Sequence, residues 1–297
     1  MRLLKNTNIG FVKTRKMGYI ISSILIIASV VSLILHGGPR YNIDFTGGTL
    51  LHLKFDKPVK IQDMREALST RGYGKAEIKH FGSENEVSIR SGIQYTTEEL
   101  STTMQQVIEQ AMPNNNFVVQ RVEKVGPQIG RELIMAAIKA IIWAMVLILL
   151  YVMWRFEFKF SIGAIAALFH DVIITLGLFS ILDIEISAPI IAALLTIVGY
   201  SLNDTIVVFD RVRENVKSSK KKAFDIPGTV NQSINEVLSR TVVTSGTTLI
   251  VVLVLYFFGG EVLRTFAFAL ILGVLIGTYS SIYVASPIVV DWRTKKA

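Results

Sequence analysis

Cysteine is absent from this chain of 297 residues. Its absence excludes a disulfide framework, thiol catalysis and thiolate metal sites. Histidine is scarce as well, with four residues, and His52 and His80 stand on predicted strands without a second metal ligand at a suitable spacing. We therefore expect no metal centre and no cofactor.

The chain is instead rich in hydrophobic residues, which make up 51% of it and raise its mean hydropathy to +0.48. They gather into long blocks and are not spread at the period of a strand or of a surface helix. Six blocks reach the roughly 17 to 25 residues that a helix needs to cross a bilayer, and the last is longer. These blocks are 19–35, 133–153, 160–182, 188–209, 241–258 and 262–290. The predicted fold class is an α-helical polytopic membrane protein with six transmembrane helices.

The short loops between these blocks alternate in charge. Basic residues occupy the loop around Arg155 and Lys159, the loop at 211–238 and the end of the chain, whereas Asp183 and Glu185 occupy one of the alternate loops and Glu261 with Arg264 the other. Because lysine and arginine collect on the cytoplasmic side of a membrane, both termini are expected there.

The charge pattern and the blocks together predict the organisation of the chain. A cytoplasmic N-terminus at 1–18 precedes an uncleaved first span at 19–35, and an extracytoplasmic domain follows at 36–130. The other five spans lie within 131–290, with a basic cytoplasmic loop at 211–238, and the cytoplasmic C-terminus is 291–297.

The net charge of +8 is a consequence of this topology. Residues 36–132 hold twelve basic and twelve acidic side chains, so the whole excess lies in the membrane part and its loops. This distribution argues against a nucleic-acid partner. The run of lysines at 220–222 is either a topology signal or a contact for anionic lipid, a ribosome or a translocon surface.

The extracytoplasmic segment has the pattern of a small α+β domain. Strands are predicted at 49–55, 76–81, 86–90 and 117–122, helices at 61–68 and 97–112, and a tight hairpin at 82–85. The order βαββαβ is that of a ferredoxin-like sandwich. Nothing in this domain indicates catalysis, so we expect it to bind or move a partner.

Asp204 stands inside the apolar block 188–209, where an ionised carboxylate is costly and therefore indicates function. Its candidate partner is Arg240, which opens the next block. Arg240 shares one helical face with Thr244, Thr247 and Thr248, and Asp204 has the polar neighbours Ser201 and Asn203. Facing polar stripes on these two spans predict an ion path in which Asp204 and Arg240 relay protons.

Other interpretations of these residues stay open. Asp204 could belong to a structural ion pair or helix cap, and Arg240 could be a boundary arginine whose head reaches the membrane surface. His170 and Asp171 form a second polar pair on the third predicted span, either a secondary polar pathway or a satisfied contact between helices.

Four motifs in the chain resemble those of the SecF family, the small subunits of the bacterial SecDF protein-export complex in the resistance-nodulation-division (RND) superfamily. They stand at 41–48, 125–130, 198–211 and 238–248. Glycine-rich loops alone occur for turn geometry. Four long motifs in the right order on a six-span plan are more specific, and together they cover essentially the whole chain.

This resemblance implies an RND-type half that pairs with SecD in the bacterial cytoplasmic (inner) membrane. The pair would assist preprotein export by the SecYEG channel, with YajC and YidC as further partners, and would use the proton-motive force. The family's essential carboxylate and its arginine partner would correspond to Asp204 and Arg240, with a less defined role for Asp171. The coupling ion would be H⁺, with Na⁺ as the alternative, and the chain would not be an enzyme.

Two hypotheses that assign the chain to another class of protein stay open. One half of a small-molecule exporter would need a substrate pocket or a second large extracellular domain, whereas the chain has a single such segment. An intramembrane aspartyl protease would use Asp171 and Asp204 as a pair that shares one proton, but the Gly-x-Gly-Asp turn of that class is missing.

The predicted topology can be tested by cysteine labelling, since the chain has no cysteine of its own. A cysteine at position 83 should react with a membrane-impermeant maleimide added to intact cells, because Ser83 lies in the extracytoplasmic segment. A cysteine in place of Ser219 should react only after the membrane is opened. Labelling in the reverse pattern would invert the orientation.

Overall fold

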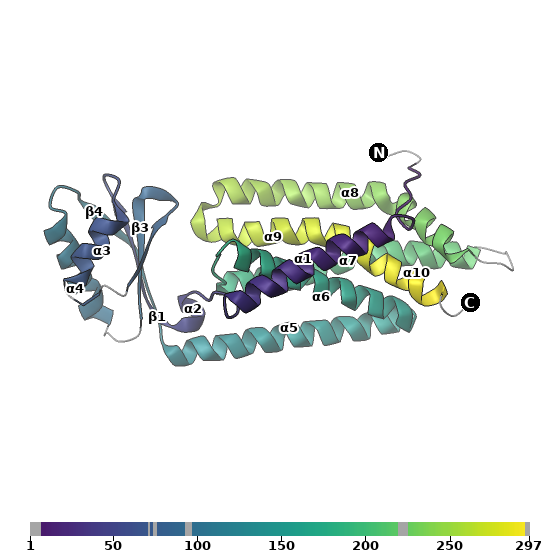
Figure 1. Ribbon diagram of the computed structural model, residues 1–297, viewed down its shortest axis with the longest axis horizontal. Helices are drawn as coiled ribbons and strands as arrows, with labels where there is room; N and C mark the ends of the chain where they lie inside the picture. Colours follow the sequence, from purple (N-terminus) through teal and green to yellow (C-terminus); the bar gives the residue numbers. More distant parts are fainter. Residues whose placement is uncertain (1–6, 71, 74–75, 93–96, 219–224, 295–297) are drawn as a thin grey trace. The chain divides into compact units, whose positions relative to one another are not determined.

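The computed structural model describes residues 7–70, 72–73, 76–92, 97–218 and 225–294. It divides into two compact units, one made of Met1–Arg40 and Lys139–Ala297 and the other of Tyr41–Ile138 (Figure 1). Ser219 and the lysines at 220–222 lie outside the described residues.

Within the described residues, six long helices are apolar enough to cross a membrane, which confirms the prediction of a polytopic helical protein. They are α1 Arg15–Leu35, α5 Pro127–Arg155, α6 Phe158–Ile181, α7 Ala188–Ser218, α8 Ile226–Phe258 and α9 Gly260–Ser280. The last span does not end at Ser280. A π-helical segment, η1 (Ser281–Ala285), and α10 (Ser286–Thr294) continue it.

The predicted loop at 211–238 is helical in its described parts, because α7 continues to Ser218 and α8 already begins at Ile226. Hydropathy marks where the apolar residues end, but the helices extend beyond that point. The polar end of α7 contacts the polar start of α8. Arg211 lies 2.6 Å from Glu236, and Asn215 donates hydrogen bonds to Glu236 at 2.8 Å and to Ser233 at 2.9 Å.

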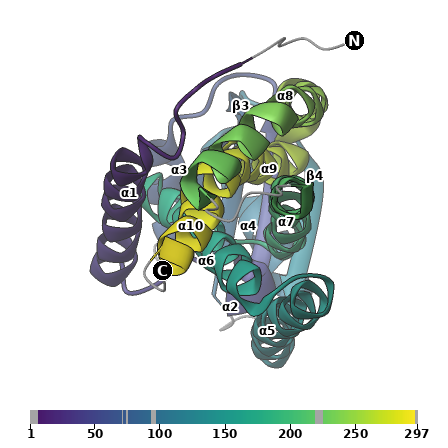
Figure 2. The ribbon, with the colours of Figure 1, turned by 90° about the vertical axis from the view of Figure 1, so that its right-hand side faces the viewer.

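The spans differ in how much they are buried. In α6, α7 and α9 half or more of the most apolar stretch is buried, whereas in α1, α5 and α8 less than a quarter is. Figure 2 shows the reason, since α1, α5 and α8 lie around the outside of α6, α7 and α9. A polar side chain on α6, α7 or α9 must therefore find its partners inside the bundle.

Ion pairs join the ends of the spans on the two sides of the bundle. Arg15 at the start of α1 lies 3.0 Å from Asp291 in α10, and the Tyr19 hydroxyl donates to the same carboxylate at 2.9 Å. On the opposite side Arg40 lies 2.5 Å from Asp183 and 3.4 Å from Glu185. The start of α1 and the end of α10 therefore share one side.

The second unit contains a four-stranded antiparallel sheet covered by two helices. After the short α2 (Ile43–Thr46), the elements follow in the order β1 Gly48–Phe55, α3 Ile61–Ser69, β2 Glu77–Phe81, β3 Ser83–Ser91, α4 Thr97–Ala111 and β4 Phe117–Val125. The strand order is β2-β3-β1-β4, so the first and third strands occupy the centre. The hairpin loop between β2 and β3 is shorter than the predicted 82–85, because β3 already begins at Ser83. Only Gly82, at φ 82°, separates the two strands.

One face of this sheet carries a closed hydrophobic core. Leu51, Leu53 and Phe55 alternate along β1, each with 1% or less of its surface exposed, and Leu53 lies opposite Val87 on β3. Met64 and Leu68 from α3 and Met104 and Ile108 from α4 complete the same cluster. The unit therefore has its own core, as an independently folding domain requires.

We predict that a fragment of residues 41–138 unfolds cooperatively and that Leu53→Ala lowers its free energy of unfolding by about 2–5 kcal/mol, because the deletion leaves a cavity in the core. Val118→Ala serves as the matched control, since Val118 on β4 is 68% exposed. Thermal denaturation followed by circular dichroism measures both. Equal losses in the two variants, or a gradual melt of the unsubstituted fragment, would contradict this account.

Candidate functional site

Asp204 lies in the middle of α7 with 2% of its surface exposed. Its Oδ2 accepts hydrogen bonds from the Ser245 hydroxyl at 3.2 Å and from the Thr278 hydroxyl at 3.4 Å, and these two hydroxyls lie 2.8 Å from each other. The carboxyl group therefore joins α7 to α8 and α9. Both contacts are longer than the roughly 2.5–2.7 Å of a strong bond between a hydroxyl and a carboxylate, so they hold the group weakly.

Arg240, the partner that the sequence suggests for Asp204, does not form an ion pair with it among the described residues. It stands on α8, five residues before Ser245, with its side chain exposed. The two charged residues are thus on packed helices, Asp204 buried and Arg240 exposed. The proton-relay role of Asp204 and Arg240 stays a prediction.

An open groove of about 760 Å³ lies between α7 and α8. Arg240 lines it together with Asn203, the residue before Asp204. The groove follows α7 from Lys217 to Asn203, the exposed neighbour of Asp204 in the chain. Its remaining lining residues are Arg155, Ile206, Val207, Asp210, Arg211, Arg213, Glu214, Glu236, Val237 and Arg240. A polar surface therefore reaches the residue beside the buried carboxyl group.

The threonine stripe predicted on α8 does not contact Asp204. The hydroxyls of Thr244, Thr247 and Thr248 donate to carbonyls of their own helix at 2.9–3.0 Å. In this part of α8 the buried polar residues are Thr241 and Ser245, which lie on a neighbouring face of the helix. Thr241, Ser245 and Thr248 share one helical face, and this choice of face would have identified Ser245. The predicted face, which starts at Arg240, does not include Ser245.

Asp171 on α6 is the centre of a second polar cluster and is fully buried. Its Oδ2 accepts hydrogen bonds from Ser201 on α7 at 2.5 Å and from Ser280 on α9 at 2.9 Å, and its Oδ1 lies 2.8 Å from His170 Nδ1. Ser201 was predicted beside Asp204, but its hydroxyl donates to Asp171. Three helices thus meet at this carboxyl group.

The second cluster continues to α1 through the other nitrogen of His170. His170 Nε2 lies 3.1 Å from the Ser22 hydroxyl, which lies 3.1 Å from the Tyr279 hydroxyl, and Tyr279 donates to the Gly18 carbonyl at 2.8 Å. The chain of contacts therefore links α1, α6 and α9. Buried polar groups in such a chain satisfy one another, and each depends on the position of the next.

The two clusters share α7 and α9. Ser201 and Asp204 are one turn apart on α7, while Thr278 and Ser280 stand two residues apart on α9 just before the π-helical segment. Sequence reasoning missed Ser22, Ser245, Thr278, Tyr279 and Ser280. The polar run at 278–281 inside an apolar block was the available signal for the residues on α9.

Two glycines allow α9 to approach α7 closely enough for these contacts. A Cβ at Gly273 would lie 2.1 Å from Ile197 Cγ1, and a Cβ at Gly277 would lie 2.9 Å from Ser201 Cβ. The spacing Gly-x-x-x-Gly is the one that permits close helix contact in membranes. The glycines therefore place the hydroxyls of α9 beside the carboxyl groups.

The family model "Protein export membrane protein SecD/SecF, C-terminal" matches residues 103–295. Among curated proteins, the protein translocase subunit SecF of Calditerrivibrio nitroreducens is 47% identical over 97% of this chain and 96% of its own length. The SecF subunit of Vibrio alginolyticus is 45% identical over 97% of this chain and 91% of its own.

Two solved structures have a similar fold. The crystal structure of SecDF from Thermus thermophilus, a translocon-associated membrane protein, superposes with a TM-score of 0.87 at 40% identity over 97% of this chain. A SecDF structure in a super-membrane-facing form gives 0.70 at 38% identity over 99% of it. This chain spans about two fifths of those SecDF chains, 39% and 40% of their lengths.

We predict that Gly273→Ala destabilises the helix bundle by about 1–3 kcal/mol, because the new methyl group overlaps Ile197 and pushes α9 away from α7. Gly246→Ala is the control, since a Cβ there meets nothing within 4 Å. Thermal unfolding of the full chain in detergent measures the difference. An unchanged midpoint for Gly273→Ala would mean that α9 does not depend on this contact.

Proposed function

The chain belongs to the SecD/SecF family of protein-export membrane proteins, and we propose that it acts as the SecF subunit of a Sec export complex driven by an ion gradient. The buried carboxyl group of Asp204, held by two hydroxyls beside a polar groove, is the observation that carries this proposal. An ionisable residue inside a membrane bundle is the expected element of a proton path.

In this proposal Asp204 takes up and releases the coupling proton. The groove supplies water as far as Asn203 and Arg240, and Asp204 is the next residue of α7 after Asn203. A charged carboxylate attracts the Arg240 guanidinium, whereas a protonated one does not, so each proton transfer changes the force between α7 and α8. Arg240 is exposed and has no ion pair among the described residues, which leaves it able to respond.

The Asp171 cluster would act as the secondary polar pathway. Ser201 donates to Asp171 and stands one turn from Asp204, so a change at Asp204 that moves α7 also moves a hydroxyl bound to Asp171. Through His170 and Ser22 the change would reach α1. Since α1 leads directly into the second unit, this is a mechanical connection between the membrane bundle and the soluble domain.

The second unit is, in this proposal, a ferredoxin-like domain on the extracytoplasmic side that holds an emerging preprotein. Its βαββαβ order and its strand order support the fold, and the alternating charge of the loops supports the side. Both termini would then be cytoplasmic, in the bacterial inner membrane.

SecD is the partner that family membership supports most directly. Arg240 and Asn203 are exposed polar residues within spans, and such residues call for a covering partner in a bilayer. SecYEG, YajC, YidC and the preprotein complete the proposed set, with no nucleic acid. The coupling ion is H⁺, with Na⁺ as the alternative, and the chain works without a cofactor.

The aspartyl-protease alternative has little support from the geometry. Asp171 and Asp204 accept hydrogen bonds from different hydroxyls, and no hydrogen bond joins the two carboxyl groups in the part of the chain that the structure describes. A catalytic pair would need to share one proton. We therefore propose a motor subunit and not an enzyme.

We predict that Asp204→Asn and Arg240→Met accumulate normally with SecD but lose the stimulation of preprotein export by the proton-motive force. Because the two residues form no ion pair here, neither substitution leaves a buried charge without its partner. A structural pair would instead lose roughly 3–5 kcal/mol of stability and much of its abundance. Export into inner-membrane vesicles, with and without an uncoupler, measures the effect.

Thr247→Val is the matched control for these two substitutions. Thr247 is exposed on α8 and its hydroxyl donates to the Val243 carbonyl of its own helix, so its loss should leave export unchanged. Normal stimulated export by Asp204→Asn or by Arg240→Met would remove that residue from the relay.

A further inference from the structure

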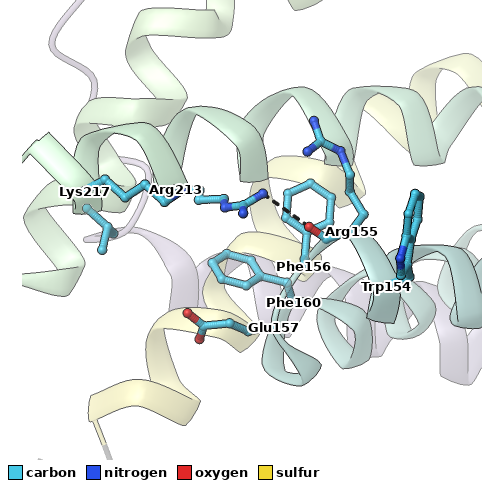
Figure 3. A pocket seen from close by; sticks show the side chains of 8 residues that line it. Trp154, Arg155, Phe156, Glu157, Phe160, Arg213 and Lys217 are labelled. Carbon is cyan, nitrogen blue, oxygen red and sulfur yellow. Dashed lines mark hydrogen bonds between the residues drawn. The ribbon is translucent and has the colours of Figure 1, made fainter.

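A pocket of about 350 Å³ lies where the turn between α5 and α6 meets the end of α7 (Figure 3). The turn consists of Phe156 and Glu157, between the last residue of α5 and the first of α6. The lining residues are Trp154, Arg155, Phe156, Glu157, Phe160, Arg213, Val216 and Lys217. The proton-relay proposal uses neither this turn nor its aromatic residues.

The pocket combines an apolar wall with a basic rim. The rings of Phe156 and Phe160, which are 7% and 3% exposed, form the wall. Arg213 and Lys217 stand one turn apart on α7 and form the rim. Their two charges act on the same small volume, since side chains four residues apart lie on one face of a helix.

These two cations are available to a ligand. Arg213 Nη1 donates to the Arg155 carbonyl at 3.3 Å, which orients the guanidinium without forming an ion pair. Among the described residues neither Arg213 nor Lys217 has an ion pair with a carboxylate. Arg155, by contrast, lies 3.2 Å from Asp210. Glu157 also lines the pocket, but in Figure 3 the Phe160 ring stands between it and Arg213.

The ends of the apolar stretches indicate that the pocket is at the boundary between hydrocarbon and water. Both helices that meet at the turn are long enough to span the membrane and are apolar. The apolar run of α7 ends at Phe209, one turn before Arg213. Trp154 is 85% exposed and Phe158 60% exposed next to the pocket, and aromatic side chains at this depth are typical of the membrane interface.

We propose that this pocket binds the headgroup phosphate of an anionic phospholipid. Arg213 and Lys217 would contact the phosphate oxygens, with the guanidinium already oriented by the Arg155 carbonyl. The acyl chains would cover the exposed faces of Trp154 and Phe158. A soluble phosphate could satisfy the cations but could not cover these apolar faces, which is why the occupant is a lipid.

The bound lipid would attach α5 to the bundle. The apolar stretch of α5 is the least buried of the six spans, at 6%, and its C-terminal end forms one wall of the pocket. A headgroup held by α7 with its chains along α5 would connect these two helices. It would thereby stabilise the cytoplasmic end of α7. Arg213 at this end is about 14 Å from Asp204 along the helix axis, at about 1.5 Å per residue.

The test uses the full chain in detergent, supplied with phosphatidylglycerol or phosphatidylcholine, and native mass spectrometry to count retained lipids. We expect one phosphatidylglycerol to be retained and no phosphatidylcholine. In Arg213→Gln/Lys217→Gln the fraction with one retained phosphatidylglycerol should fall at least about tenfold, since each basic side chain contributes about 1 kcal/mol of attraction to anionic lipid. Lys217→Gln alone should lower it several-fold without touching the hydrogen bond of Arg213.

Lys13→Gln/Lys16→Gln is the matched control, because it removes two exposed cations on the side of the bundle where α1 begins. It should keep the retained lipid, and Arg213→Lys/Lys217→Arg should restore most of it. Thermal unfolding in phosphatidylcholine verifies that every variant is folded. Equal loss in the control pair, undiminished retention in the pocket variants, or full competition by inorganic phosphate at the same concentration would overturn the proposal.

Discussion

The structure depends on the hydrogen bonds that satisfy two carboxyl groups inside an apolar bundle. Asp171 and Asp204 are 0% and 2% exposed, and in a bilayer no water competes for them along most of the span. Apart from His170, which is on the same helix as Asp171, their partners are hydroxyls on other helices, so the packing of α6, α7, α8 and α9 is coupled to the positions of these groups. A small shift of one helix would cost more here than in a purely apolar bundle, because it would leave polar atoms unpaired.

The geometry of α9 follows from this constraint. Its glycines at 273 and 277 remove the side chains that would keep it from α7, and its polar residues at 278 and 280 then reach both carboxyl groups. The π-helical segment begins directly afterwards, and the Ser286 hydroxyl donates to the Ser281 carbonyl at 2.7 Å, satisfying a group in the altered hydrogen-bond pattern. Single-turn π segments commonly stand at functional sites, and here one adjoins both polar clusters.

The sequence predicted the six apolar helices and the small antiparallel sheet well, and the partners of the site residues less well. Long apolar blocks and alternating strands are local patterns, so all six helices were identified and the β-strands were placed within a few residues, whereas α8 begins at Ile226, well before the predicted 241. Arg211, Glu236 and Asn215 extend α7 and α8 beyond the apolar blocks through contacts between helices, which hydropathy does not detect. Likewise Asp204 was identified because an ionised carboxylate in an apolar block is costly in free energy. Its hydrogen-bond donors Ser245 and Thr278 are distant in the chain, so no local pattern predicts them.

By itself, the sequence determined that this protein has six membrane-spanning helices, that an α+β unit follows the first of them, and that Asp171, Asp204 and Arg240 are unusual beside their apolar blocks. These properties depend on composition and on periods of a few residues. The tertiary structure decided which polar side chains meet: Ser201 with Asp171, Ser245 with Asp204, and Arg240 with a groove. The reason is that a hydroxyl on an apolar helix can bond to its own backbone or to a neighbouring helix, and only the rotation and distance of the packed helices select between the two.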